Sequence, residues 1–207
     1  TNEGGVNKTT RFLKNIIGFW PLQESRRYWL DHGKEYSYAE LANLAKRAGH
    51  VNAWIDLNDQ RFLKAGNMPE KIEAYLTETK QIVKNNPGFI TAVILESLAF
   101  SYRDTIKSIE SVTGKTIEKL HAVGGGIQNE LLNQYTADAI GKPVYTGPVE
   151  GTIIGNIGIQ MIASGTVASL EELRCIVEKS FEIKKYEPVN QAYFNINEES
   201  YKKILKN

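Results

Sequence analysis

The stretch His121–Glu150, HAVGGGIQNELLNQYTADAIGKPVYTGPVE, decides the fold class of this 207-residue chain. It begins within a short apolar run, Leu120–Val123, which is followed by three glycines and then by a helical pattern over Asn129–Ile140. A second short strand is expected at Lys142–Thr146, after which a Gly-Pro pair turns the chain into another helix. This alternation of strands and helices predicts an α/β fold.

The glycines Gly124, Gly125 and Gly126 lie between the strand and the helix, and Asn129 begins the helix. Backbone amides without neighbouring side chains can approach an anion closely, and a helix start adds a favourable dipole. A phosphate site is one interpretation, and a tight turn where strand and helix pack is the other. A helix terminus contributes about 0.3–1 kcal/mol to holding an anion, whereas millimolar affinity needs about 4 kcal/mol. Contacts to the rest of a nucleotide must therefore supply the remainder.

Several other kinds of site are excluded by spacing. A dinucleotide fingerprint needs a third glycine where Asn129 stands, and the triplet starting at Gly114 lacks the earlier glycine of a P-loop. The histidines His32, His50 and His121 do not have zinc-ligand spacing. We therefore expect neither of these phosphate motifs, and no metal held by the chain itself.

The residues before this region are mainly helical in pattern. Apolar residues recur at helical spacing over Arg11–Asp31, a helix that Gly18 and Pro21 should bend. The pair Ser37 and Glu40 is a capping-box signature, which predicts a short helix directly after it.

Two more helices are expected, over about 69–84 and over Phe89–Thr113, with a polar loop at Asp56–Asn67 before them. The second is apolar enough to be the buried backbone of the domain. Glu96 lies within it, and a buried carboxylate needs a partner. We interpret Glu96 as a structural hydrogen-bonding group rather than a catalytic one.

The last third of the chain continues with helices. The one over Glu150–Ala163 carries Gly151, Gly155 and Gly158 at helical spacing, which favours close packing against a neighbour, with a helix start near a nucleotide as the alternative. Further helices are expected at Leu170–Lys179 and Glu198–Lys206. The strands are too few for a complete sheet, so we expect a half-sheet from residues upstream.

The amino-acid composition limits the kinds of partner that the protein can bind. The 25 basic and 24 acidic residues leave a formal net charge of +1, which provides no broad field for nucleic acid or anionic lipid. Cys175 is the only cysteine, so an internal disulfide is impossible. No apolar run approaches the ~20 residues that span a bilayer, and no leader opens the chain. We expect a cytoplasmic protein with a small-molecule ligand, no nucleic acid partner and no membrane partner.

Six segments in order carry a family resemblance: TNEGGV, FLKNIIGFWPLQESRR, YSYAELANLA, IDLNDQRF, ILESLAF and HAVGGGIQNELLNQYTADAIGKPVYTGPVEGTIIGNIGIQ. Over nearly the whole chain they resemble the C-terminal region of the FGGY carbohydrate kinases, in the branch that acts on L-rhamnulose. The resemblance implies the C-terminal part of an actin/hexokinase-like (ribonuclease H-like) ATPase domain, helix-rich, with an incomplete sheet because upstream strands are missing. Within 1–207, the expected parts are a helical part (about 9–115), a strand-loop-helix nucleotide part (about 117–180) and a helical tail (about 190–207).

The same resemblance implies that MgATP and L-rhamnulose meet in a cleft between two domains, giving L-rhamnulose 1-phosphate in L-rhamnose catabolism. The cofactors it implies are ATP and Mg²⁺. Carried over by position, Asn15 matches a sugar-contacting asparagine, and Gln23 and Gly125 match ATP-contacting residues. Gly124, Gly126 and Asn129 belong to the same ATP loop.

Three departures from the family pattern matter. Pro21 stands where an ordinary helix former is expected. Lys80 interrupts a Thr-Gly-Gln pattern seen in relatives. The family's N-terminal kinase domain, with its aspartate base and phosphate-binding strand, is expected before Thr1, so no catalytic residue is expected in this chain and the chain alone should be inactive. The alternatives are a kinase for another ketose or a polyol, and a noncatalytic nucleotide-binding module of the same fold.

Overall fold

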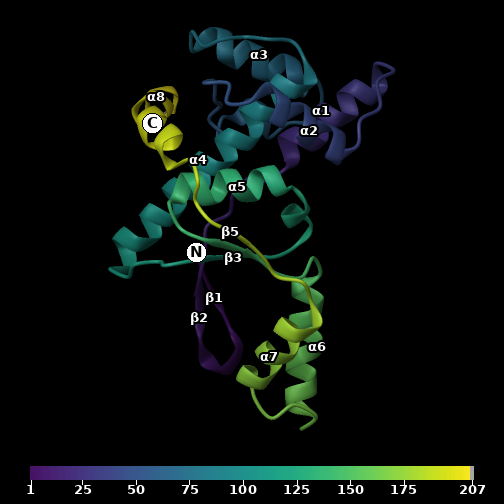
Figure 1. Ribbon diagram of the computed structural model, residues 1–207, viewed down its shortest axis with the longest axis vertical. Coiled ribbons are helices and arrows are strands. Elements are labelled where there is room, and N and C mark those ends of the chain that lie inside the picture. The colour runs from purple at the N-terminus through teal and green to yellow at the C-terminus, as the bar shows by residue number, and fades with distance from the viewer. Residues whose placement is uncertain (206–207) are drawn as a thin grey trace.

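The computed structural model describes residues 1–205 as a helix-rich α/β chain (Figure 1). Lys206, the predicted end of the last helix, lies outside the described residues. No helix within 1–205 is long and apolar enough to cross a membrane. The helices of this range are α1 (Trp20–Asp31), α2 (Tyr38–Ala48), α3 (Met68–Glu78), α4 (Pro87–Thr113), α5 (Glu130–Ile140), α6 (Gly151–Ala163), α7 (Leu170–Ser180) and α8 (Gln191–Ile204).

Two small sheets accompany these helices. Strands β1 (Asn2–Gly4) and β2 (Thr10–Phe12) form an antiparallel hairpin. Strands β3 (Leu120–Ala122), β4 (Val144–Thr146) and β5 (Lys184–Tyr186) form a sheet in that order, with β3 parallel and β5 antiparallel to β4. Figure 1 shows α5 between this sheet and helices α1–α4, while α6 and α7 extend from the other side. The predicted strand-helix-strand unit is confirmed.

The helix predicted over Arg11–Asp31 is wrong in its first half. Strand β2 occupies the start of this range, and Gly18 adopts a positive φ of 63° before α1 begins. Pro21 lies in the first turn of α1, where its missing N–H costs no hydrogen bond, so it starts this helix rather than bending it. The apolar spacing was misleading because Ile16 and Ile17 pack against the core from an irregular segment outside any helix.

The helix predicted over about 69–84 is also too long. Helix α3 ends early because Lys80 adopts a left-handed φ of 57°. The side chain of Gln81 then accepts a hydrogen bond from the backbone N–H of Trp54 at 2.8 Å and donates one to its C=O at 2.9 Å. Pro87 is the first residue of α4 and not the end of the preceding helix.

The predicted capping box at the start of α2 is confirmed. The backbone N–H of Glu40 donates to the Ser37 hydroxyl, and the Glu40 carboxylate accepts from the backbone N–H of Ser37 at 2.7 Å. This hydrogen bond lowers the pKa of Glu40. The start of α2 is therefore fixed in place, which matters for the site described below.

Helix α4 forms the buried backbone of the core, as predicted, and Glu96 lies at its centre with no exposed surface. Its carboxylate accepts hydrogen bonds from Trp54 Nε1 (3.0 Å), the Val51 N–H (3.3 Å) and the Tyr193 hydroxyl (2.6 Å), and lies 3.0 Å from His50 Nδ1. Burial and then the Glu96 charge raise the pKa of Tyr193, so its hydroxyl stays a donor. The structural interpretation of Glu96 is confirmed.

Helix α8 completes this core from the far end of the chain. It starts before Glu198, where its beginning was predicted. The ring of Tyr201 stacks on Phe100 at a centroid distance of 4.4 Å, and the Tyr75 hydroxyl donates to the carbonyl of Ile204 at 2.5 Å. The core is thus closed by contacts between residues about a hundred positions apart.

The glycine spacing in α6 reflects close packing at two of its three positions. A Cβ on Gly158 would lie 2.4 Å from Leu173 of α7, and one on Gly151 would lie 3.0 Å from Val123. A Cβ on Gly155 would meet no heavy atom within 4 Å. Gly158 therefore lets α7 approach α6, whereas Gly155 has no such role.

Candidate functional site

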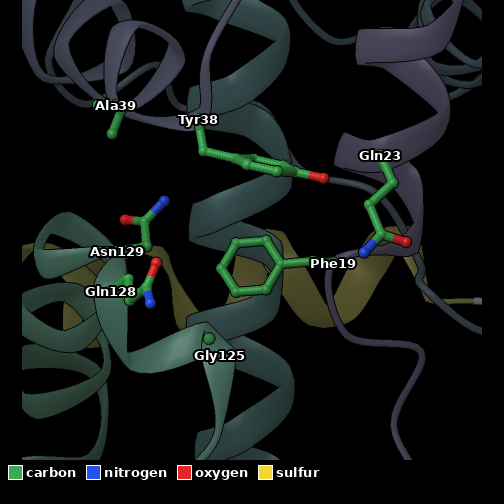
Figure 2. A pocket seen from close by; sticks show the side chains of 9 residues that line it. Phe19, Gln23, Tyr38, Ala39, Gly125, Gln128 and Asn129 are labelled. Carbon is green, nitrogen blue, oxygen red and sulfur yellow. The ribbon is translucent and has the colours of Figure 1, made fainter. Parts of the chain in front are cut away.

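A cavity of about 460 Å³ opens between the starts of α1 and α2 and the turn after β3. Small-molecule sites typically measure about 300–1,000 Å³. Figure 2 shows the rings of Phe19 and Tyr38 above the Gly125 turn, with the side-chain amides of Gln23 and Asn129 on opposite sides. The lining residues are Phe19, Gln23, Tyr38, Ala39, Ala42, Gly125, Gly126, Gln128 and Asn129.

The three glycines of the turn differ in what they do. Gly124 has a φ of 93°, its N–H donates to the Pro148 carbonyl, and it is not among the lining residues. A Cβ on Gly126 would lie 3.2 Å from Phe19 Cε2, so this glycine lets the ring pack closely. A Cβ on Gly125 would meet nothing within 4 Å. The backbone of Gly125 is therefore open to the cavity.

The backbone amides that face the cavity belong to the glycine turn, which precedes α5 in the chain. Gly125 and Gly126 are the first residues of a short 3-10 helix, and amides at a helix start have no partner within the helix. The start of α5 itself is capped, because the Asn129 side-chain oxygen accepts from the Leu132 N–H at 2.9 Å. An anion would therefore meet the glycine turn rather than the first turn of α5.

Gln23 and Asn15 do not share a helix, although both lie within the helix predicted over Arg11–Asp31. Gln23 lies on an exposed position of α1 between the buried Leu22 and Glu24, and lines the cavity. Asn15 lies in the irregular segment before α1, is exposed and is not among the lining residues. Their separation follows from the late start of α1 at its first-turn proline.

Several lining residues were not predicted: Phe19, Tyr38, Ala39, Ala42 and Gln128. The capping box did locate Tyr38 as the first residue of α2. No local pattern indicates that α2 begins opposite a turn almost ninety residues later, so only the packed structure reveals this wall of the cavity.

The cavity offers no carboxylate ligand for Mg²⁺ from this chain. None of its lining residues carries a carboxylate, and within residues 1–205 no group of three or more His, Cys, Asp or Glu side chains could hold a metal ion. Mg²⁺ prefers one or two carboxylates together with substrate phosphates. The residues present do not fit the ion by themselves.

The model of the FGGY family of carbohydrate kinases, C-terminal domain, matches residues 1–164. The chain belongs to this family.

Among individual relatives, the chain is 41% identical over 206 residues to the rhamnulokinase of Bacillus subtilis, covering 100% of this chain and 42% of the relative. It is 41% identical over 199 residues to the rhamnulokinase of Enterococcus faecalis, covering 94% of this chain and 40% of the relative. The chain thus spans less than half the length of the relatives it matches.

Solved structures share the fold at low sequence identity. A xylulose kinase from Rhodospirillum rubrum superposes with a TM-score of 0.60 at 15% identity, over 89% of this chain and 36% of that one. Plasmodium falciparum glycerol kinase with ADP superposes with a TM-score of 0.60 at 14% identity, over 87% and 35%. The expected actin/hexokinase-like fold is confirmed.

Proposed function

We propose that the intact protein containing this chain transfers the terminal phosphoryl group of ATP to L-rhamnulose, giving L-rhamnulose 1-phosphate in L-rhamnose catabolism. This chain supplies the ATP-binding wall. The observation that carries the proposal is the cavity that gathers Gln23, Gly125 and Asn129 in a member of a carbohydrate kinase family. The choice of sugar rests on the 41% identity to proteins named rhamnulokinase.

The residues of this chain act by positioning and by charge stabilisation, which dominate phosphoryl transfer. The amides of Gly125 and Gly126 face the ATP phosphates from the turn. The carboxamides of Gln23 and Asn129 contact the nucleotide from the two sides of the cavity, where Figure 2 shows them. Asn15, exposed on the segment before α1, is the proposed sugar contact.

The remaining chemistry belongs to the rest of the intact protein. The base that deprotonates the sugar hydroxyl and the carboxylates for Mg²⁺ would come from a domain outside this chain, so the chain alone is expected to be inactive. We propose that the cavity lies between a helical part (about 9–115) and a nucleotide part (about 117–180), followed by a tail (about 190–207). The cytoplasm, where ATP is abundant, is the proposed compartment.

The direct test is a kinase assay of the intact protein with MgATP against L-rhamnulose, L-fuculose, D-xylulose and glycerol. We expect the highest kcat/KM with L-rhamnulose. A preference for D-xylulose or glycerol would establish the alternative of another ketose or a polyol, which the shared fold of xylulose and glycerol kinases makes the nearest rival. ATP binding without turnover of any sugar would support a noncatalytic nucleotide-binding module.

Two substitutions test the ATP wall itself. Gln23→Ala and Gly125→Ala should each raise the KM for ATP about tenfold, the equivalent of roughly 1.4 kcal/mol, and leave the KM for the sugar nearly unchanged. The matched control is Gly155→Ala, since both glycines have open space around a new Cβ but Gly155 lies on α6, outside the cavity. An unchanged KM for ATP in the Gln23 and Gly125 variants would remove both residues from the site.

A further inference from the structure

Tyr38 separates two cavities. Its ring lines the cavity at the Gly125 turn and also a second cavity of about 350 Å³ on the outer side of α1. The residue is 45% exposed although it sits at the first position of a capped helix, whose start is fixed by its neighbours. A large, partly exposed aromatic ring on a fixed backbone is suited to contact a flat ligand.

One face of this ring is already covered. The guanidinium carbon of Arg26 lies 5.0 Å from the centroid of the Tyr38 ring, within cation–π range. Arg26 lines only the second cavity, and its Nε donates to the carbonyl of Tyr36. Arg26 therefore backs the ring from the outer side, and the other face remains turned toward the Gly125 turn.

Part of the cavity beside the ring is lined by small groups, and the carboxamides of Gln128 and Asn129 stand at its edge (Figure 2). Ala39 and Ala42 of α2 and the open backbone of Gly125 present no bulky side chain there. In Figure 2 the ring of Phe19 lies between Tyr38 and the Gly125 turn, and its Cε2 is 3.2 Å from where a Cβ on Gly126 would be. An arrangement of one flat ring above a glycine backbone, bordered by alanines, leaves room for a planar heterocycle.

We propose that Tyr38 stacks on the base of the bound nucleotide and is the residue that positions it, with Arg26 holding the ring from behind. The inference rests on the proposed function, since it names the part of ATP that this wall of the same cavity takes. Stacking supplies part of the affinity that the glycine turn alone lacks. It does not select among bases, because every base offers a π-face.

The test uses the intact protein with its native segments in place, and compares Tyr38→Ala with Tyr38→Phe and Tyr38→Trp. Affinities for ATP, GTP and inorganic tripolyphosphate are measured by calorimetry. Tyr38→Ala should weaken ATP and GTP binding by about 5- to 150-fold, the effect of losing one base–aromatic stack, and leave tripolyphosphate binding unchanged. The two aromatic variants should retain nucleotide affinity within about threefold.

A spectroscopic readout separates stacking from a structural role. The fluorescence of 1,N⁶-etheno-ATP should be quenched on binding to the native protein, and the quenching should be lost with Tyr38→Ala and kept with Tyr38→Phe. Tyr145→Ala is the matched control, because that tyrosine is also flanked by cations, Lys119 and Lys185, but lies outside the cavity.

The possible results are distinguishable. If the native protein binds ATP and Tyr38→Ala binds it equally well, the stacking inference is overturned while the ATP-binding wall stands. If Tyr38→Ala weakens tripolyphosphate as much as ATP, the residue shapes the turn rather than contacting the base, and the inference is again overturned. If the native protein binds no nucleotide, the proposed function and the inference fail together.

Discussion

Replacing Glu96 tests whether the buried carboxylate organises the core. In Glu96→Ala, the Trp54 indole, the Val51 N–H and the Tyr193 hydroxyl lose their common acceptor, and His50 loses its partner. Hydrogen bonds to a charged group contribute about 1.5–3 kcal/mol each, and removing one partner of a buried charged cluster costs about 3–5 kcal/mol. The total stays near this range rather than summing, because His50 is partly exposed and water can reach that side.

Glu96→Gln gives a second, graded perturbation. The amide can direct its oxygen toward Trp54 and Tyr193 and its NH₂ toward His50, which can accept in its other tautomer. The Val51 N–H can only donate, so it then faces another donor across the 3.3 Å contact. The expected loss is about 1–3 kcal/mol, the cost of one unsatisfied buried group and of the lost charge.

The assay is thermal and urea unfolding of the intact protein, followed by circular dichroism and by tryptophan fluorescence, to which Trp54 contributes. With about 2–4 °C of Tm per kcal/mol for a domain of this size, Glu96→Ala should lower Tm by roughly 6–20 °C. The control is Glu199→Ala, whose carboxylate is 80% exposed and 3.7 Å from Lys202, so it should change stability by less than about 0.5 kcal/mol. A loss below about 1 kcal/mol for Glu96→Ala would refute the reasoning.

Three further predictions follow from local geometry. Lys80→Gly should stabilise the protein by about 0.5–1 kcal/mol in urea unfolding, because Lys80 holds a φ of 57° that glycine adopts without strain. Gly158→Ala should destabilise the packing of α6 on α7 by about 1–3 kcal/mol, because the new Cβ clashes with Leu173. Gly155→Ala should instead stabilise α6 by about 0.5–1 kcal/mol, because its Cβ meets open space. Amide hydrogen exchange of α6 measures both effects. Hydrogen bonds from Lys107 and Lys202 lower the pKa of Glu198 from 4.5 to about 2. Its contribution to the free energy of unfolding is therefore present above pH 4.5 and lost as the pH falls toward 2. Glu198→Gln should remove this part of the pH dependence of the free energy of unfolding, measured by urea unfolding between about pH 2 and 5.

The elements predicted correctly share strong local signals. Helix α5 lies between a glycine turn and the left-handed Gly141, and α4 begins after Asn86 and ends at the left-handed Gly114. Strand β4 is a short apolar run between turn residues. In each case capping chemistry and apolar spacing agree, so the sequence alone locates the element to within a few residues.

The errors arise where packing decides the backbone. Strand β5 carries Lys184 and Lys185 and is largely exposed, so it has no apolar alternation to reveal it, and pairing with β4 alone makes it a strand. Ile16 and Ile17 keep helical spacing in a segment that is not a helix. The end of α3 depends on the left-handed backbone conformation of Lys80, which a lysine in the sequence does not predict.

The candidate site divides in the same way. The glycines after β3 are visible as a local motif, although only the structure distinguishes the open Gly125 from the tightly packed Gly126. Tyr38 and Phe19 come from separate helical regions that meet only in the folded chain. The sequence therefore indicated the glycine turn, Asn129 and Gln23, and only tertiary packing reveals that Tyr38 and Phe19 join them.

The closure of the core by α8 bears on how the chain is made. Phe100 meets its stacking partner Tyr201, and Tyr75 its acceptor at Ile204, only after the ribosome has added the intervening segment. At about 5–20 residues per second, synthesis of those hundred or so residues takes roughly 5–20 s. During that interval the aromatic surface of α4 faces solvent, so nascent chains paused before α8 are where chaperone capture and misassembly should concentrate.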